Sequence, residues 1–166
     1  MRKKYLLIGA VVIVAAVVGL YAWYSIGDAA DLPNDPDELT LFSIDGKMHH
    51  TVGDQKAQPK DQELLYQYPV LGRVDITDPN LRRRIMASVK QDIRSGAVQN
   101  KCFEPRHVLR VKKGGSTIDM VICFKCHNYS MSRDGGPLPG ITPSIGARSQ
   151  QLLNNILNDA GVPLAP

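Results

Sequence analysis

One stretch, residues 101–131, constrains the fold of this 166-residue chain more than any other, because it holds a tight hairpin signal and all three cysteines. Gly114-Gly115 separates two runs in which apolar and polar residues alternate, and a two-residue hairpin turn favours glycine at both central positions. Such a turn fixes the register of the strands on either side of it. We therefore predict an antiparallel hairpin in which Arg110 lies opposite Asp119 and forms a cross-strand ion pair with it.

The rest of the chain after the acidic residues near position 38 predicts one compact domain. Apolar stripes at helical spacing indicate helices after Asp78-Pro79 and after Ser149, and we expect Asp78 and Ser149 to cap them. The expected strands beside the hairpin cover residues 39–44, 68–76 and 128–132, and the expected loops cover 46–63 and 133–144. The fold class is therefore α+β, a small antiparallel sheet with two packed helices over residues 39–166.

A run without charge, residues 5–24, precedes the domain. It is long enough for an apolar helix to cross a hydrocarbon core of about 30 Å. Arg2, Lys3 and Lys4 come directly before it, so the positive-inside rule puts the N-terminus in the cytoplasm and the remaining chain outside. A cleaved signal peptide is the alternative, but its apolar core would be about 7–15 residues long. We favour an uncleaved signal-anchor transmembrane helix over residues 1–26.

Residues 27–38 are rich in acidic side chains and contain two prolines, which predicts an acidic linker between the anchor and the domain. The domain would then be extracytoplasmic, in the periplasm, and held to the cytoplasmic membrane by a single pass. That compartment permits disulfides, which changes the chemistry expected of the cysteines.

The net charge of +4 gives little support to nucleic-acid binding. Three basic residues belong to the N-terminal flank, and the only basic cluster in the remaining chain is Arg82-Arg83-Arg84, which suits a solvated helix face. No nucleophile–base pair, carboxylate pair or glycine-rich phosphate loop is recognisable, so the sequence does not indicate an enzyme.

The run Cys123-Phe-Lys-Cys126-His127 has the spacing of a c-type haem attachment site. Both cysteines would form thioethers, His127 would be an axial ligand, and Met131 is a candidate for the second ligand. Two features oppose this hypothesis, because a strand leads into Cys123 and few large apolar residues remain to enclose a haem. Haem c is therefore an alternative, and with it the function of a membrane-tethered electron-transfer cytochrome.

Cys102, His107, Cys123 and Cys126 make up a candidate Cys₃His zinc set, which suits a closed tetrahedral site. The predicted hairpin sends Cys123 and His107 to opposite faces of the sheet, so this site requires a bulge near Pro105. A thioredoxin-like use of Cys123 and Cys126 is disfavoured, because the residues that follow do not predict the helix that lowers a thiol pKa.

A structural disulfide is the interpretation that we favour. Cys102 would pair with Cys123 or Cys126, close a loop of about 20 residues, and leave one thiol buried. Arg106 and His107 would then be hydrogen-bonded positioning residues.

Three segments of the domain form a recognisable pattern: Cys102-Phe-Glu-Pro-Arg-His107, Ile122-Cys-Phe-Lys-Cys126 and Ala160-Gly-Val-Pro-Leu-Ala165. With them the chain resembles a family of uncharacterised bacterial exported or membrane-anchored domains, over the whole region after the linker. The resemblance implies that the three cysteines and His107 belong together, and it implies no particular activity. The family pattern ends at Cys126 and does not include His127.

The function expected from the sequence is that of a binding or accessory module. The chain would be a single-pass membrane protein with an extracytoplasmic domain, and its candidate partner is another protein. The rival expectation is the tethered cytochrome, because the haem motif is specific even though its surroundings are poor.

Overall fold

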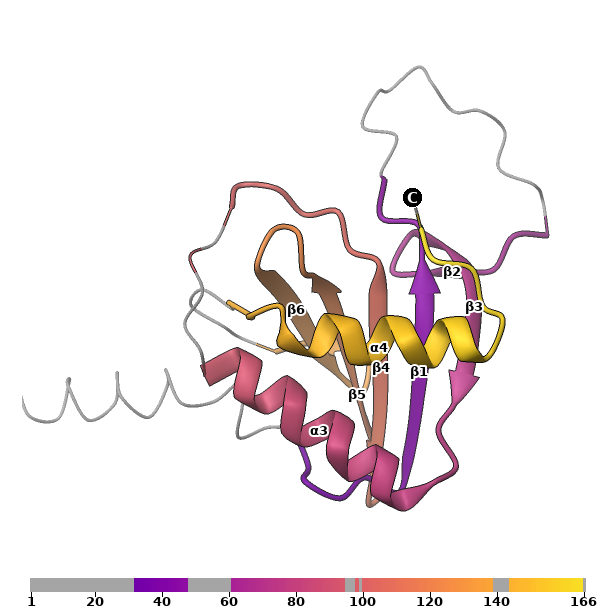
Figure 1. Ribbon diagram of the computed structural model, residues 1–166, viewed down its shortest axis with the longest axis vertical. Coiled ribbons are helices and arrows are strands. Elements are labelled where there is room, and N and C mark those ends of the chain that lie inside the picture. The colour runs from indigo at the N-terminus through magenta and orange to yellow at the C-terminus, as the bar shows by residue number, and fades with distance from the viewer. Residues whose placement is uncertain (1–31, 48–60, 95–97, 99, 139–143, 166) are drawn as a thin grey trace, which may run out of the picture.

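The computed structural model describes residues 32–47, 61–94, 98, 100–138 and 144–165 of the chain. The described part is an α+β fold with one seven-stranded antiparallel sheet, in the order β2-β3-β1-β4-β5-β6-β7, and two helices (Figure 1). The strands are β1 (Glu38–Ile44), β2 (Leu64–Leu65), β3 (Tyr68–Asp75), β4 (His107–Lys113), β5 (Ser116–Cys123), β6 (Asn128–Arg133) and β7 (Gly136–Pro137). The helices are α3 (Pro79–Arg94) and α4 (Arg148–Asp159). The predicted antiparallel sheet with two packed helices is confirmed.

The β4–β5 hairpin has the predicted turn. Gly114 and Gly115 have φ values of +57° and +86°, which is the backbone that a type I′ turn requires. Two further hairpins at the sheet edges also have positive φ at both turn residues, Tyr66-Gln67 between β2 and β3 and Asp134-Gly135 between β6 and β7. The loop predicted over residues 133–144 misses the second of these, although an Asp-Gly pair is a strong hairpin signal.

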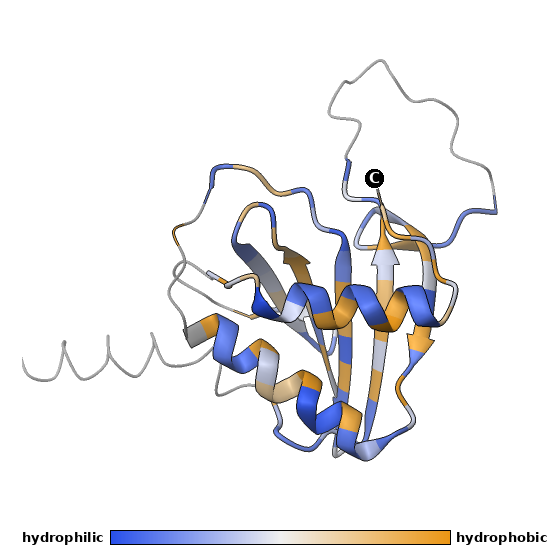
Figure 2. Ribbon diagram, in the orientation of Figure 1, coloured by the Kyte–Doolittle hydropathy of each residue, from blue (hydrophilic) through white to orange (hydrophobic). Residues whose placement is uncertain are grey.

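Both helices lie on the same side of the sheet (Figure 1). Figure 2 shows that the outward side of α4, which faces the viewer, is mainly polar. Alternate residues of β1, β4 and β5 point towards the helices, as expected for a sheet with one covered face. The main core between sheet and helices includes Leu39, Leu41, Ile85, Met86, Leu109, Met120, Ile122, Ile145, Leu153 and Leu157.

The sheet curls over its other face. The turn between β2 and β3 reaches back across the strands, so that Tyr66 Oη donates a hydrogen bond to Asp119 Oδ2 of β5 over 2.8 Å. A second apolar cluster packs on this inner face, and its members are Phe42, Ile44, Tyr68, Val70, Val108 and Val121. The curl explains why apolar residues occur on both faces of the central strands. The outermost strands, β2 and β7, are only two residues long, and such short edge strands offer little backbone for pairing with another chain.

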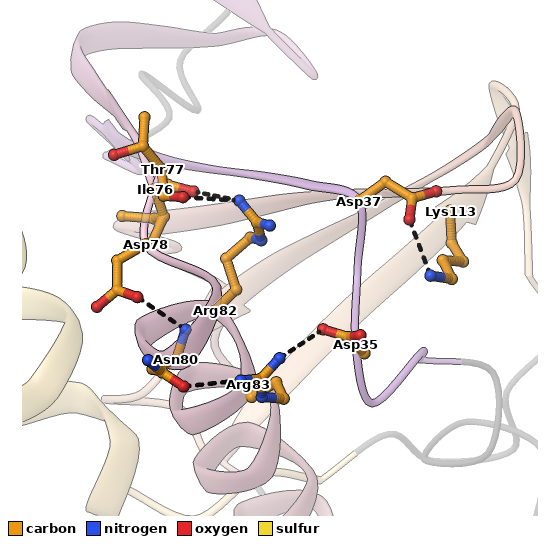
Figure 3. Close-up of polar contacts among 9 residues, drawn as sticks. All are labelled: Asp35, Asp37, Ile76, Thr77, Asp78, Asn80, Arg82, Arg83 and Lys113. Carbon is orange, nitrogen blue, oxygen red and sulfur yellow. Dashed lines mark hydrogen bonds and ion pairs between the residues drawn. The ribbon is translucent and has the colours of Figure 1, made fainter.

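Part of the predicted linker belongs to the folded domain. Leu32 is 2% exposed and lies in the main core. Figure 3 shows Asp35 paired with Arg83 of α3, and Asp37 paired with Lys113 at the end of β4. The packed domain therefore includes residues 32–38, because the acidic composition that suggests a linker does not show that a single leucine is buried.

The two helices begin differently. Asp78 caps α3 as predicted, since its Oδ1 accepts the N–H of Asn80 over 2.8 Å. The prediction that Ser149 caps the last helix is wrong, because α4 already begins at Arg148. Instead, Asp92 Oδ2 of α3 accepts both the backbone N–H and the hydroxyl of Ser149, each over 2.6 Å. This cap comes from a residue 57 positions away, so no local pattern indicates it.

The two ends of the chain differ in what the structure describes. The predicted anchor, residues 1–26, lies outside the described residues, and no described helix is long and apolar enough to cross a membrane. At the other end, the segment after α4 packs against the sheet. Ser43 Oγ donates to the carbonyl oxygen of Pro163 over 2.6 Å, and Val162 lies directly against Gly72.

Candidate functional site

The three cysteines meet at one end of the sheet. Cys123 ends β5, Cys126 lies in the turn before β6, and Cys102 lies in the segment that leads into β4. Cys102 and Cys126 form a disulfide that spans 24 residues, and Cys123 is a buried free thiol. All three Sγ atoms lie within 4.8 Å of one another. Of the two partners predicted for Cys102, the structure therefore contains the bond to Cys126.

The segment that carries Cys102, residues 100–106, is held from two sides. Asn128 Nδ2 donates to the carbonyl oxygen of Cys102 over 2.8 Å. On the other side, Gly46 lies so close that a Cβ added there would be 1.9 Å from the carbonyl oxygen of Pro105. Only glycine allows this backbone approach, so the segment is fixed by packing and hydrogen bonds as well as by the disulfide.

The Cys123 thiol is buried. Burial raises the pKa of the thiol above its ordinary value. Hydrogen bonds from the backbone N–H groups of Glu104 and Cys126 partly offset this effect, and the second of these spans 3.2 Å to Cys123 Sγ. The net result is a thiol that is mainly protonated at neutral pH, with donors positioned to stabilise the small thiolate fraction.

His107 lies apart from the cysteines, because alternation along the strands sends it to the helix-covered face and Cys123 to the other. The β4–β5 register runs through His107 and Ile122 without a shift, so no bulge redirects either side chain. His107 Nε2 lies 2.8 Å from Asn154 Oδ1 of α4. Among the described residues, the group able to hold a metal ion consists of the three cysteines without His107. The predicted Cys₃His zinc set is therefore not assembled.

The residues predicted to bind haem are poorly arranged for that role. Cys126 is bonded to Cys102, so its sulfur is not free to form a thioether. Met131 is 8% exposed and packs in the main core on the helix side of β6, whereas Cys123 points to the other face. His127 Nδ1 lies 3.2 Å from a backbone carbonyl oxygen. A haem on this motif would require a different disulfide state and a second ligand other than Met131.

The predicted Arg110–Asp119 ion pair is confirmed and belongs to a polar network inside the curl. Arg110 Nε and Nη2 donate to the two carboxylate oxygens of Asp119 over 2.8 and 2.7 Å. Its guanidinium also lies 5.3 Å from the ring centroid of Phe42. Tyr66 Oη bonds the same carboxylate and lies 2.5 Å from Ser132 Oγ. This bidentate pairing compensates a charge that is only 6% exposed.

Arg106 acts through its main chain. Its carbonyl oxygen accepts the N–H of Ile44 over 3.1 Å, and its own N–H donates to the carbonyl oxygen of Ile122 over 3.2 Å. These bonds continue the pairing of β4 with its two neighbours beyond the end of the strand. Backbone hydrogen bonds therefore supply the positioning role predicted for this residue.

A polar groove of about 460 Å³ opens beside the network, between β1, β3, β4 and the start of α3. Its charged walls come from four separate segments, and they consist of Asp37, Glu38, Arg73, Asp75, Arg82, Arg110 and Lys112. Figure 3 shows Arg82 at the α3 side, where Nη1 donates to the carbonyl oxygens of Ile76 and Thr77. The sequence carries no local signal for this groove, because its walls come from segments that only the pairing of β1 with β3 and β4 and the position of α3 bring together.

Fold and site together define a disulfide-stabilised α+β domain with a buried third thiol and a charged groove. In comparisons with known proteins, no family model, no curated protein and no solved structure matches the chain. The functional argument therefore depends on the chemistry of the residues described above.

Proposed function

We propose that this protein is a membrane-anchored extracytoplasmic domain that works as a binding or accessory module. The observation that supports it most directly is the Cys102–Cys126 disulfide, because structural disulfides form and persist in oxidising compartments. The uncharged run of residues 5–24, with its basic flank, supports an anchor that leaves the domain outside.

Binding is favoured over nucleophilic catalysis by the positions of the two most reactive side chains. The Cys123 thiol faces the inside of the curl, and His107 faces α4, where it bonds Asn154. A nucleophile and its base must lie within hydrogen-bond reach of each other, and these two groups are separated by the sheet.

The charged groove is the surface that we assign to the partner. Its walls include the exposed Lys112–Glu38 ion pair at 2.7 Å, and its Arg73 pairs with the exposed Glu63 outside the groove at 3.7 Å. Exposed pairs contribute little to stability, so their charges can take new partners at low cost. An extended polypeptide segment with charges of both signs suits such a wall better than an apolar small molecule, which binds in enclosed apolar cavities.

The location is tested by fractionating cells that express the full chain. We expect the protein to stay in membranes after an alkaline wash, to become protease-sensitive when only the outer membrane is opened, and to carry the disulfide in acid-trapped samples. A variant without residues 1–26 should leave the membrane fraction. A protease-resistant domain with three reduced thiols would contradict the proposal. A pyridine haemochrome spectrum of the same membranes tests the rival cytochrome, since a c-type α band would overturn the accessory role.

The groove is tested with a photo-crosslinking amino acid at Thr40 in the full chain. We expect an adduct with a specific protein, and we expect Arg73→Glu to reduce that adduct strongly by reversing a wall charge. The matched control carries the crosslinker at Gln151, an exposed position on α4. Equal adducts from both positions, or an adduct that is unaffected by Arg73→Glu, would contradict the assignment.

A further inference from the structure

The three clustered cysteines include one reactive group that a structural disulfide does not need, the free thiol of Cys123. Cys123 Sγ lies within 4.8 Å of both sulfurs of the Cys102–Cys126 bond. A thiolate beside a disulfide attacks one of its sulfurs and expels the other, and the reaction needs no further reagent. The three side chains are thus close enough for the disulfide to change partners inside the folded domain.

We propose that the cluster is a thiol–disulfide exchange site, in which Cys123 attacks Cys126 Sγ and transfers the disulfide from Cys102–Cys126 to Cys123–Cys126. One S–S bond forms as the other breaks, and the electron pair of the broken bond leaves on the sulfur of Cys102. Cys123 gives up its proton to solvent, and the Cys102 thiolate regains one. No net oxidation or reduction occurs within the protein.

Attack on Cys126 is favoured over attack on Cys102 by the burial of the leaving sulfur. Cys126 is 0% exposed, so expelling it would leave a thiolate in the interior, where charge is costly. Cys102 lies in a half-buried segment at the surface, where a thiolate can be solvated. The turn also supports the new bond, because the N–H of Cys126 already lies 3.2 Å from Cys123 Sγ.

The exchange has an external consequence, because it moves the free thiol from the interior to residues 100–106. The released Cys102 thiolate can attack a disulfide of a small molecule or polypeptide, form a mixed disulfide with it and expel that substrate's second sulfur as a thiolate. The backbone N–H of Asn100 bonds the carbonyl oxygen of Cys126 over 2.9 Å. This bond keeps Cys102 near the cluster, so the exchange is reversible.

The environment of Cys123 makes this reaction slow at neutral pH. Burial raises the pKa of Cys123, the charge of Glu104 raises it further, and the charge of Lys125 lowers it. Tyr68 also faces the sulfur, but it is neutral in this range. Below its pKa the thiolate fraction of Cys123 increases about tenfold per pH unit, and the rate of exchange should follow it.

The decisive experiment finds which cysteine is alkylated in the native, oxidised full chain. The protein is incubated without reductant at about pH 8 with N-ethylmaleimide and then mapped by mass spectrometry under non-reducing conditions. We expect the label on Cys102, together with a Cys123–Cys126 disulfide in the same molecules. Label on Cys123 beside an intact Cys102–Cys126 bond would overturn the proposal. The absence of any label, while the denatured chain reacts fully, would also overturn it.

Two variants serve as controls. Cys123→Ala keeps the disulfide and lacks the attacking thiol, so labelling of Cys102 should be lost. Cys102→Ala should form the Cys123–Cys126 disulfide when treated with oxidised glutathione. A folded Cys102→Ala protein that keeps two free thiols would contradict the proposal. The label position in the natural sequence decides the question even if a variant fails to fold. The result is independent of the anchor and the groove, so it tests the exchange site separately from the proposed function.

Discussion

At the scale of single residues, His107 illustrates how far the environment can override a sequence motif. It follows Cys102 closely in the chain, yet its ring faces α4, where it lies 2.8 Å from Asn154 Oδ1 and edge-on to Phe124. An amide oxygen only accepts hydrogen bonds, so Nε2 of His107 is the donor in this contact. Its Nδ1 is buried and has no hydrogen-bond partner among the described residues.

We predict that His107 makes the domain less stable in acid. Burial lowers the pKa of His107 from 6.5 to about 4, so the unfolded chain binds its proton first as the pH falls. Protonation of the unfolded chain at His107 therefore leaves the free energy of unfolding unchanged above pH 6.5. Between pH 6.5 and 4 it lowers that free energy by about 3 kcal/mol. Urea unfolding at several pH values measures it. His107→Gln does not titrate, and parallel pH profiles for the two proteins would refute the prediction.

At the scale of secondary-structure elements, the junction between α3 and α4 depends on one carboxylate. Asp92 and Ser149 are both 0% exposed, and Asp92 Oδ2 accepts two hydrogen bonds from Ser149. These bonds satisfy a donor at the first turn of α4 that the helix itself cannot pair. The start of α4 is therefore defined by its contact with α3.

We predict that Asp92→Ala lowers the free energy of unfolding by about 2 kcal/mol or more, since it leaves the buried N–H of Ser149 unpaired. Ser149→Ala removes only the hydroxyl and should cost about 1 kcal/mol. Chemical denaturation measures both. Gln151→Ala, which breaks an exposed contact on the same helix, serves as the control and should change little. An equal effect of all three variants would show that the carboxylate has no special role.

At the scale of the whole molecule, the disulfide joins two parts of the chain that are far apart in the sequence. It ties residues 100–106 to the β5–β6 turn across a separation of 24 residues. It lies at the end of the sheet where β5 stops, and it closes a loop that contains the entire β4–β5 hairpin. Its main effect on stability is therefore to restrict the unfolded chain.

We predict that reduction lowers the free energy of unfolding by about 3 kcal/mol while the fold persists. The double variant Cys102→Ala/Cys126→Ala should match the reduced protein and should not respond to reductant. Cys123→Ala should keep the full response. Denaturation curves with and without dithiothreitol provide the measurement, and a natural protein that is insensitive to dithiothreitol would contradict the prediction.

The sequence by itself determines the features that are set by neighbouring residues. Gly114-Gly115 fixes the hairpin because both positions need positive φ, and the fixed register then pairs Arg110 with Asp119. Asp78 starts α3 because the acceptor and the free N–H lie two residues apart. These contacts involve short separations or follow from one turn, so the local pattern contains the information needed to predict them.

Only the tertiary structure decides which distant residues meet. It selects Cys126 over Cys123 as the partner of Cys102, separates His107 from the cysteines, and caps α4 with Asp92. It also buries Leu32 and assembles the groove from four segments. Each of these outcomes depends on how the sheet curls and where the helices pack, and these are set by the sum of many weak contacts across the whole domain. No single stretch of sequence encodes that sum.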